Sequence, residues 1–191
     1  GSACVLHYIE NDKICKDGDL LLIDVGAGYA NYNSDLTRTI PVNGKFSKRQ
    51  KDVYNAVLRV MKKHQLEMKP GVQILDLQKM SEQNMEKELV DLGLLTMDDI
   101  KNQNPSWPAF KKYFMHGVSH FLGLDVHDVG DPYRKLEPGM VFTCEPGIYI
   151  REEGIGIRIE NDILITEGGN FDLMKNIPRE VEEIEEIMNS K

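Results

Sequence analysis

Two hydrophobic periods share the chain, and together they predict an α+β domain. Apolar positions three and four residues apart predict helices over 48–65, 74–92 and 179–188, with a short one over 97–102. Ser47 and Gln50 form a capping box before the first helix, and Gly93 closes the second. Short apolar or alternating runs predict extended structure from residue 113 onward and strands over 4–9, 20–23, 35–42, 141–144, 148–150 and 155–165.

One pattern occurs twice along the chain. Asp24 closes a strand six residues after Gly18, and Glu145 closes another six residues after Gly139. Each acid begins an acid-x-Gly step, and each is followed by a second strand that carries another acid. Two related β-hairpins facing one another across a pseudo-two-fold axis would produce this repeat. The alternative is that the repeat is coincidental, because a glycine a few residues before an acidic residue is common around the start of strands.

The register of these two hairpins decides whether their acids meet. If each hairpin turns midway between its acids, Asp24 lies opposite Asp35 and Glu145 lies opposite Glu160. Directly opposed Cβ atoms on antiparallel strands are about 5 Å apart. Carboxylates this close repel unless a cation lies between them or one of them is protonated. A one-residue change of register would instead put the partners on opposite faces.

Three of the five histidines, His116, His120 and His127, fall within twelve residues. A spacing of four puts His116 and His120 on one face of either a strand or a helix, and Gly123 permits a bend before His127. Clustered histidines in a chain with paired acids indicate metal ligands or proton carriers. His64 follows two lysines on a predicted helix, and we expect it to be solvated.

Four carboxylates with an imidazole and no thiolate form a hard, oxygen-rich donor set. This set favours Mn²⁺, with Co²⁺, Zn²⁺ and Fe²⁺ as alternatives. Four negative charges balance two divalent ions, about 3.5–4 Å apart, better than they balance one. Cys144 adjoins Glu145, but strand alternation turns it to the opposite face, so we do not count it as a ligand.

Composition narrows the function classes. The 191 residues are 41% hydrophobic and 28% charged, which indicates one globular domain over 1–191. A net charge of −8 argues against nucleic-acid binding, which depends on Lys and Arg. We expect no membrane association, because no apolar run approaches the roughly 20 residues of a membrane span. No signal peptide is evident at the start of the sequence. The three cysteines are odd in number and follow no recognisable spacing, which is typical of reduced thiols, so we expect a cytoplasmic protein.

Six ordered motifs give the chain a family resemblance, and they lie at 21–26, 34–39, 116–123, 126–128, 143–147 and 156–160. Together they resemble the aminopeptidase P members of the M24 metallopeptidases, over almost the whole chain. The resemblance implies the pita-bread fold, a curved antiparallel sheet with flanking helices and two pseudo-two-fold half-units. Family members usually carry an N-terminal domain and further elements before the motif at His7, so we expect this chain to be N-terminally truncated and its activity to be impaired.

The same resemblance implies a site with two divalent metal ions, most simply Mn²⁺. Asp24 would bind one ion and Asp35 both, while His120 and Glu145 would bind the second ion and Glu160 would bridge the two. A hydroxide between the ions would be the nucleophile.

Further roles follow from the resemblance for residues around the metal ions. Glu145 would also accept and transfer the proton, while His116 and His127 would stabilise the scissile carbonyl and contact the proline side of the substrate. His7 would be a further active-site histidine. Arg158, two residues before Glu160 on the same strand face, would hold carboxylates in place.

The leading hypothesis is a metal-dependent aminopeptidase that releases the N-terminal residue from peptides with proline second. We also expect a homo-oligomer for the full-length protein. Prolidase, which uses the same ligands on dipeptides, is the first alternative, although Ser119 and the run 121–124 favour aminopeptidase P. Methionine aminopeptidase fits less well, because 124–128 departs from its usual pattern. A metal-free pita-bread binding module is the alternative from another class.

Overall fold

The computed structural model describes Cys4 and residues 10–190. Of the strand predicted over 4–9, only Cys4 is described; the rest, His7 included, lies outside the described residues. Within 4 and 10–190, no helix has both the length and the apolar character that crossing a membrane requires.

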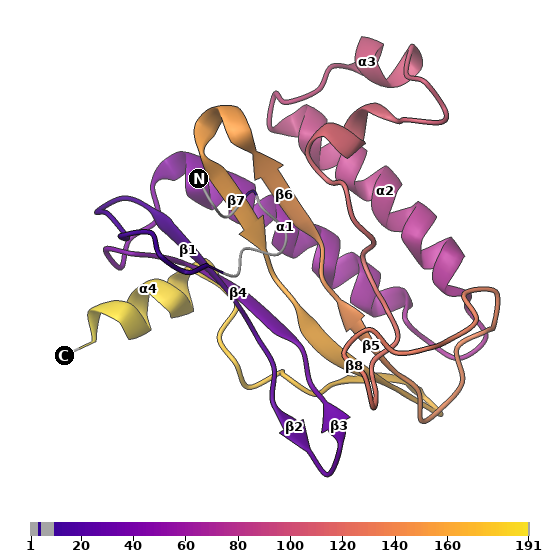
Figure 1. Cartoon of the computed structure of the whole chain (residues 1–191). Coiled ribbons are helices and arrows are strands. Elements are labelled where there is room, and N and C mark those ends of the chain that lie inside the picture. The colour runs from indigo at the N-terminus through magenta and orange to yellow at the C-terminus, as the bar shows by residue number, and fades with distance from the viewer. Residues whose placement is uncertain (1–3, 5–9, 191) are drawn as a thin grey trace.

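The described chain mixes helices with antiparallel strands, as predicted (Figure 1). The strands are β1 (Leu20–Val25), β2 (Gly28–Tyr29), β3 (Tyr32–Asn33), β4 (Leu36–Pro41), β5 (Val141–Cys144), β6 (Gly147–Ile150), β7 (Ile155–Arg158), β8 (Asn161–Thr166) and β9 (Gly169–Asp172). The helices are α1 (Lys48–Glu67), α2 (Ile74–Asp91), α3 (Met97–Lys101) and α4 (Val181–Asn189), with 3₁₀ turns η2 (Ala109–Lys112) and η3 (Arg151–Glu153).

Most predicted elements in the described region are confirmed, with boundaries shifted by at most two residues. Two predictions are wrong. The strand over 155–165 is divided into β7 and β8, and 113–140 is largely irregular rather than extended. The division follows from partner choice, because β7 pairs with β6 whereas β8 pairs with β5.

The capping box at the start of α1 is confirmed. The Ser47 hydroxyl accepts from the Gln50 backbone N–H, and the Gln50 side chain accepts in return from the Ser47 N–H at 2.8 Å. Two N–H groups that the helix cannot satisfy are thereby paired.

We expect Ser47→Ala to lower the free energy of unfolding by about 1 kcal/mol, because it removes this cap. Urea denaturation measures the change. Ser106→Ala, an exposed loop serine, is the control, and an equal loss in both variants would contradict the capping role.

The first hairpin differs from its predicted register by two residues. Asp24 lies opposite Thr37 rather than opposite Asp35. The reason is the turn, which is centred on Ala30 and Asn31, both with positive φ, one residue later than predicted. Side chains alternate with a period of two, so a shift of two keeps Asp24 and Asp35 on the same face.

The second hairpin has the predicted register. β6 and β7 place Gly147 opposite Arg158, and β5 and β8 continue the same register beyond them. Glu145 and Glu160 therefore lie opposite one another. The ladder is interrupted at this point because Pro146 has no N–H to donate.

The core lies between the sheet strands and the two long helices. α1 packs against α2 and against β5, β6 and β7, and Figure 1 shows α1 behind these strands with α2 to their right. On the other side, β1 and β4 contact β7. Cys144 faces α1, where its buried thiol donates to the Met61 carbonyl at 3.7 Å, so its predicted orientation away from Glu145 is confirmed.

The predicted environment of His64 is wrong. It was expected to be solvated, but its side chain is fully buried, with Nδ1 at 2.8 Å from Ser81 Oγ on α2. His64 shares the face of α1 that carries Val57, Val60 and Met61, and this face packs in the core. Burial lowers the pKa of His64 to about 4.

Candidate metal centre

Acidic and imidazole side chains from separate parts of the chain converge on one region. Asp35, His120 and Glu160 offer ligand atoms that all lie within 4.8 Å of one another. His120 Nε2 is 3.6 Å from Asp35 Oδ2 and 3.5 Å from Glu145 Oε1. Four of the five predicted ligands therefore meet.

Local chain geometry brings these four side chains together. Asp35 immediately precedes β4, Glu145 follows β5, and Glu160 lies between β7 and β8. His120 comes from the irregular segment 118–122, which follows the edge of β5: Glu145 N donates to Val118 O, and Thr143 N donates to His120 O. The strand or helix predicted for the histidines is therefore wrong, although their convergence does not depend on it.

Asp24 lies at the edge of this group and is held by Arg158. The Arg158 guanidinium donates to Asp24 Oδ2 at 2.5 Å, to Tyr149 Oη at 2.9 Å and to Thr37 Oγ1 at 3.1 Å. Arg158 is buried, whereas the Asp24 side chain is 39% exposed. Arg158 thus orients a carboxylate, as expected. Asp24 does not belong to the group of three residues whose ligand atoms all lie within 4.8 Å of one another.

The other two histidines of the cluster, His116 and His127, flank the acids. His116 Nδ1 is 3.9 Å from Glu145 Oε2, and His116 Nε2 is 2.9 Å from Tyr149 Oη. The His127 ring meets the His120 ring edge-on, with centroids 4.5 Å apart. Both rings therefore line the same region as the predicted ligands.

Hydrogen bonding fixes which ring nitrogen of His120 faces the acids. Nδ1 is 2.9 Å from the Phe121 carbonyl, which can only accept, so Nδ1 carries the proton. In the neutral ring, Nε2 then presents its lone pair towards Asp35 and Glu145. This is the arrangement that metal-ligating histidines use.

Crowding of the acids disfavours their charged forms. Burial and the charges of Asp35 and Asp24 raise the pKa of Glu145 to about 7, against the opposing effect of His120 and Arg158. Burial, followed by the charges of Glu145 and Asp35, raises the pKa of Glu160 well above its ordinary value. Burial alone would lower the pKa of His120, but its contacts with Asp35, the Phe121 carbonyl and Glu145 outweigh burial and raise it. The site therefore favours an added positive charge.

The donors fit a divalent cation. Glu160 Oε2 accepts from Thr37 Oγ1 at 2.6 Å, while the buried Glu160 Oε1 has no hydrogen-bond partner among the described residues. Such an oxygen is costly unless something positive approaches it. A buried carboxylate oxygen without a partner, next to Asp35 and the Nε2 lone pair of His120, is a suitable ligand set for a hard cation.

Sequence reasoning missed four polar residues that support the site, namely Thr37, Thr143, Tyr149 and Asp162. A positional signal was present for all four, because each lies an even number of residues from a predicted ligand and so shares a strand face with it. Thr37 and Asp162 lie two residues after Asp35 and Glu160, Thr143 lies two before Glu145, and Tyr149 lies four after Glu145. Burial, followed by the charge of Asp35, raises the pKa of Asp162 to about 7.

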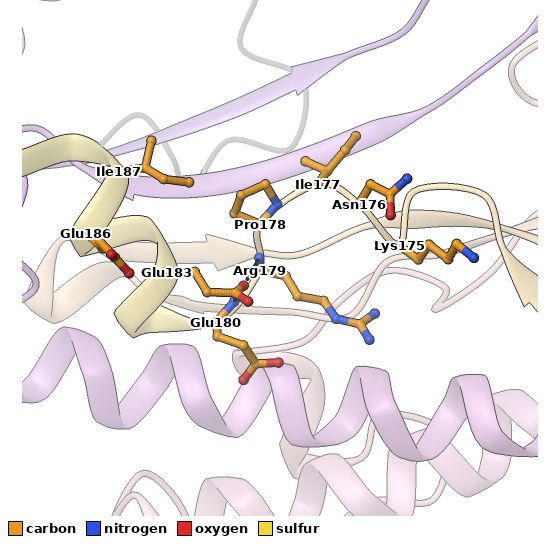
Figure 2. Close-up of a pocket in the computed structure, with 9 residues that line it drawn as sticks. All are labelled: Lys175, Asn176, Ile177, Pro178, Arg179, Glu180, Glu183, Glu186 and Ile187. Atoms are coloured by element: carbon orange, nitrogen blue, oxygen red, sulfur yellow. Dashed lines mark hydrogen bonds between the residues drawn. The ribbon is translucent and has the colours of Figure 1, made fainter. Parts of the chain in front are cut away.

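A surface hollow of about 390 Å³ lies beside α4, away from the acids (Figure 2). Two of its charged side chains already have partners: Arg179 Nη1 is 2.9 Å from Asp172, and Glu180 is 2.7 Å from Lys62 Nζ. None of the predicted site residues that the structure describes lines it. The convergence around His120 is therefore the candidate functional site.

The sequence matches a known family model and several characterised relatives. The model of metallopeptidase family M24 matches residues 1–167. The chain is 46% identical to the Xaa-Pro aminopeptidase of Escherichia coli (strain K12), with 98% of the chain and 45% of that protein covered. It is 40% identical to human Xaa-Pro aminopeptidase 3, with 95% of the chain and 38% of that protein covered. The chain thus spans less than half the length of these relatives.

Solved structures of E. coli aminopeptidase P resemble the chain at 46% identity and a TM-score of 0.90, with 97% of this chain and 44% of theirs covered. This likeness confirms the pita-bread fold. One of the structures is zinc-substituted and holds a product. Others carry one alanine substitution each. Two of the substituted residues are aspartates eleven residues apart, and a substituted histidine lies seventeen residues before the first of them. The remaining three are histidines, the second four residues after the first and the third seven residues after the second.

Proposed function

Because the chain belongs to metallopeptidase family M24, we propose that it forms the catalytic domain of a metal-dependent Xaa-Pro aminopeptidase. Such an enzyme releases the N-terminal residue from peptides whose second residue is proline. The observation that carries the proposal is the convergence of Asp35, His120, Glu145 and Glu160. The names of the relatives supply the substrate class.

We propose Asp24, Asp35, His120, Glu145 and Glu160 as ligands of two divalent ions, with Mn²⁺ favoured by the oxygen-rich donor set. Co²⁺, Zn²⁺ and Fe²⁺ are the alternatives. Support comes from the E. coli variants, whose aspartate spacing equals that of Asp24 and Asp35. When bound, the ions supply Lewis acidity, which polarises the scissile carbonyl and makes an attacking water more acidic.

Glu145 is the proposed proton acceptor for the attacking water and the proton donor to the leaving nitrogen. A carboxylate works best in this role when its pKa lies near the working pH, and burial raises the pKa of Glu145 towards neutrality. Its oxygens lie 3.5 Å from His120 Nε2 and 3.9 Å from His116 Nδ1, so it stands between the proposed metal ligands and the substrate side.

His116 and His127 are proposed to line the substrate side, where they would contact the scissile carbonyl and the proline-side residue. Tyr149 Oη accepts from Arg158, so its own proton is free to reach His116 Nε2, and the Gly117 carbonyl can take the proton of His116 Nδ1 at 2.7 Å. These bonds fix the orientation of the His116 ring. His7, which lies outside the described residues, is proposed as a further active-site histidine, because its distance from Asp24 in sequence equals the seventeen residues seen in the E. coli variants.

We propose that residues 1–191 form one catalytic domain whose substrate is a peptide with proline in second position. We also propose that the protein is a cytoplasmic homo-oligomer and that it binds neither nucleic acid nor membranes. The acidic net charge of −8 supports the exclusion of nucleic acid.

Hydrolysis of an Xaa-Pro-Yaa tripeptide and of an Xaa-Pro dipeptide, each with added Mn²⁺, tests the proposal. We expect release of the N-terminal residue from the tripeptide, loss of that release in EDTA, and slower cleavage of the dipeptide. Preference for the dipeptide would identify a prolidase. Metal bound without cleavage of either peptide would contradict the enzymatic function of this chain.

Metal removal should lower the stability of the fold. Bound ions offset the repulsion between the clustered carboxylates, and a ligand at 100 times its Kd adds about 2.7 kcal/mol. We therefore expect Mn²⁺ to raise Tm by about 5–10 °C over the EDTA-treated chain in differential scanning fluorimetry. Glu160→Gln should abolish most of this rise, and a wild-type Tm indifferent to Mn²⁺ would contradict the metal centre.

A further inference from the structure

Two buried side chains on neighbouring strands each hold the backbone of a different proposed ligand. Thr143 on β5 lies opposite Asp162 on β8. Thr143 Oγ1 accepts from the His120 N–H at 3.1 Å, and Asp162 Oδ2 accepts from the Asp35 N–H at 3.1 Å. Both acceptors are almost completely inaccessible to solvent.

These two N–H groups belong to segments that no regular ladder holds at these points. The segment 118–122 follows the edge of β5 without forming a continuous strand. Asp35 lies just before β4, which meets β7 and β8 largely through side chains: Thr39 Oγ1 donates to the Arg158 carbonyl, and Arg38 Nη1 donates to the Glu160 carbonyl. At this junction side-chain groups replace ladder bonds, and a buried N–H left unpaired would be unfavourable.

We propose that Thr143 and Asp162 are positioning residues of the metal centre. As one cross-strand pair, they set the separation between the Asp35 carboxylate and His120 Nε2, now 3.6 Å, by fixing the backbone of each ligand. The inference rests on the proposed function only for the identity of the ligands. Neither Thr143 nor Asp162 is itself a proposed ligand.

Metal affinity distinguishes positioning from a merely structural role. Thr143→Val keeps the shape of the side chain and removes the acceptor, whereas Thr143→Ser keeps the hydroxyl. Asp162→Ala removes the second acceptor, and Asp162→Asn keeps an oxygen for the Asp35 N–H. Thr166→Val, at the far end of β8, is the matched control. Thr143→Ala replaces the valine variant if that variant does not fold.

Calorimetric titration of the full 191-residue chain with Mn²⁺, together with the absorption spectrum of bound Co²⁺, provides the measurement. We expect Thr143→Val and Asp162→Ala each to weaken Mn²⁺ affinity roughly 10- to 100-fold and to change the Co²⁺ spectrum. Thr143→Ser, Asp162→Asn and Thr166→Val should stay within about threefold of the wild type. The double variant should lose less than the product of the single losses, because both acceptors set the same separation.

The outcomes separate this inference from the proposed function. Wild-type Mn²⁺ affinity in both Thr143→Val and Asp162→Ala, with only Tm lowered, would overturn the positioning role and leave the proposed function standing. An equal loss of affinity in Thr166→Val would overturn it as well, since the effect would then be general destabilisation. A wild-type chain that binds no Mn²⁺ would overturn the metal centre itself.

Discussion

Glu145→Gln is expected to lower kcat/KM for an Xaa-Pro-Yaa tripeptide by about 10²–10⁴-fold at saturating Mn²⁺. The amide is nearly the same size as the carboxylate but cannot accept the proton of the attacking water. It also removes one negative charge from a group of buried acids, of which Glu145 is the member in contact with both His116 and His120. Saturating Mn²⁺ keeps weaker metal binding from being mistaken for loss of the proton acceptor.

Glu137→Gln is the matched control for this variant. Glu137 is exposed and pairs with Arg134 three residues away at 2.7 Å, an arrangement that contributes little to stability. It should leave kcat/KM unchanged. Activity of Glu145→Gln within tenfold of the wild type would show that another group accepts the proton.

The two hairpins show how far strand alternation can predict a site. A register error of two residues in the first hairpin left Asp24 and Asp35 on one face, because alternation has the same period. The Asn31 of its turn was an available signal, since asparagine tolerates positive φ. In the second hairpin, η3 and Gly154 form a turn centred on the predicted position.

Tertiary contacts explain what the sequence could not predict about the site. The three clustered histidines were recognised from spacing, but their irregular conformation depends on hydrogen bonds to β5, some twenty residues further along the chain. Thr143 and Thr37 carry no chemistry that marks a threonine as functional. Their roles depend on how β4 and the segment 118–122 meet the second hairpin, which local sequence does not specify.

His64 was misinterpreted for a different reason, because the sequence did contain the relevant signal. It lies seven residues after Val57 and four after Val60, on the apolar stripe of α1. The preceding lysines concealed this periodicity. Lys62 and Lys63 point away from the stripe, and Lys62 pairs with Glu180 at 2.7 Å.

Burial of this imidazole predicts a pH-dependent loss of stability. Burial lowers the pKa of His64 to about 4 in the folded chain, against about 6.5 when unfolded. Between these values the unfolded chain binds a proton that the folded chain does not, so folding weakens as pH falls from 6.5 to 4 and the loss levels off below 4. The difference amounts to about 3 kcal/mol.

We therefore expect the free energy of unfolding of the wild type to fall by about 3 kcal/mol more than that of His64→Gln between pH 7 and pH 4, in urea denaturation of the EDTA-treated chains. The glutamine does not titrate, and the remaining acids titrate in both proteins. Ser81→Ala removes the hydroxyl at 2.8 Å from His64 Nδ1 and should keep the pH dependence, since it leaves the imidazole buried. An imidazole titration by NMR with a midpoint near 6.5, or parallel pH profiles for the wild type and His64→Gln, would show that the folded chain accepts a charged His64.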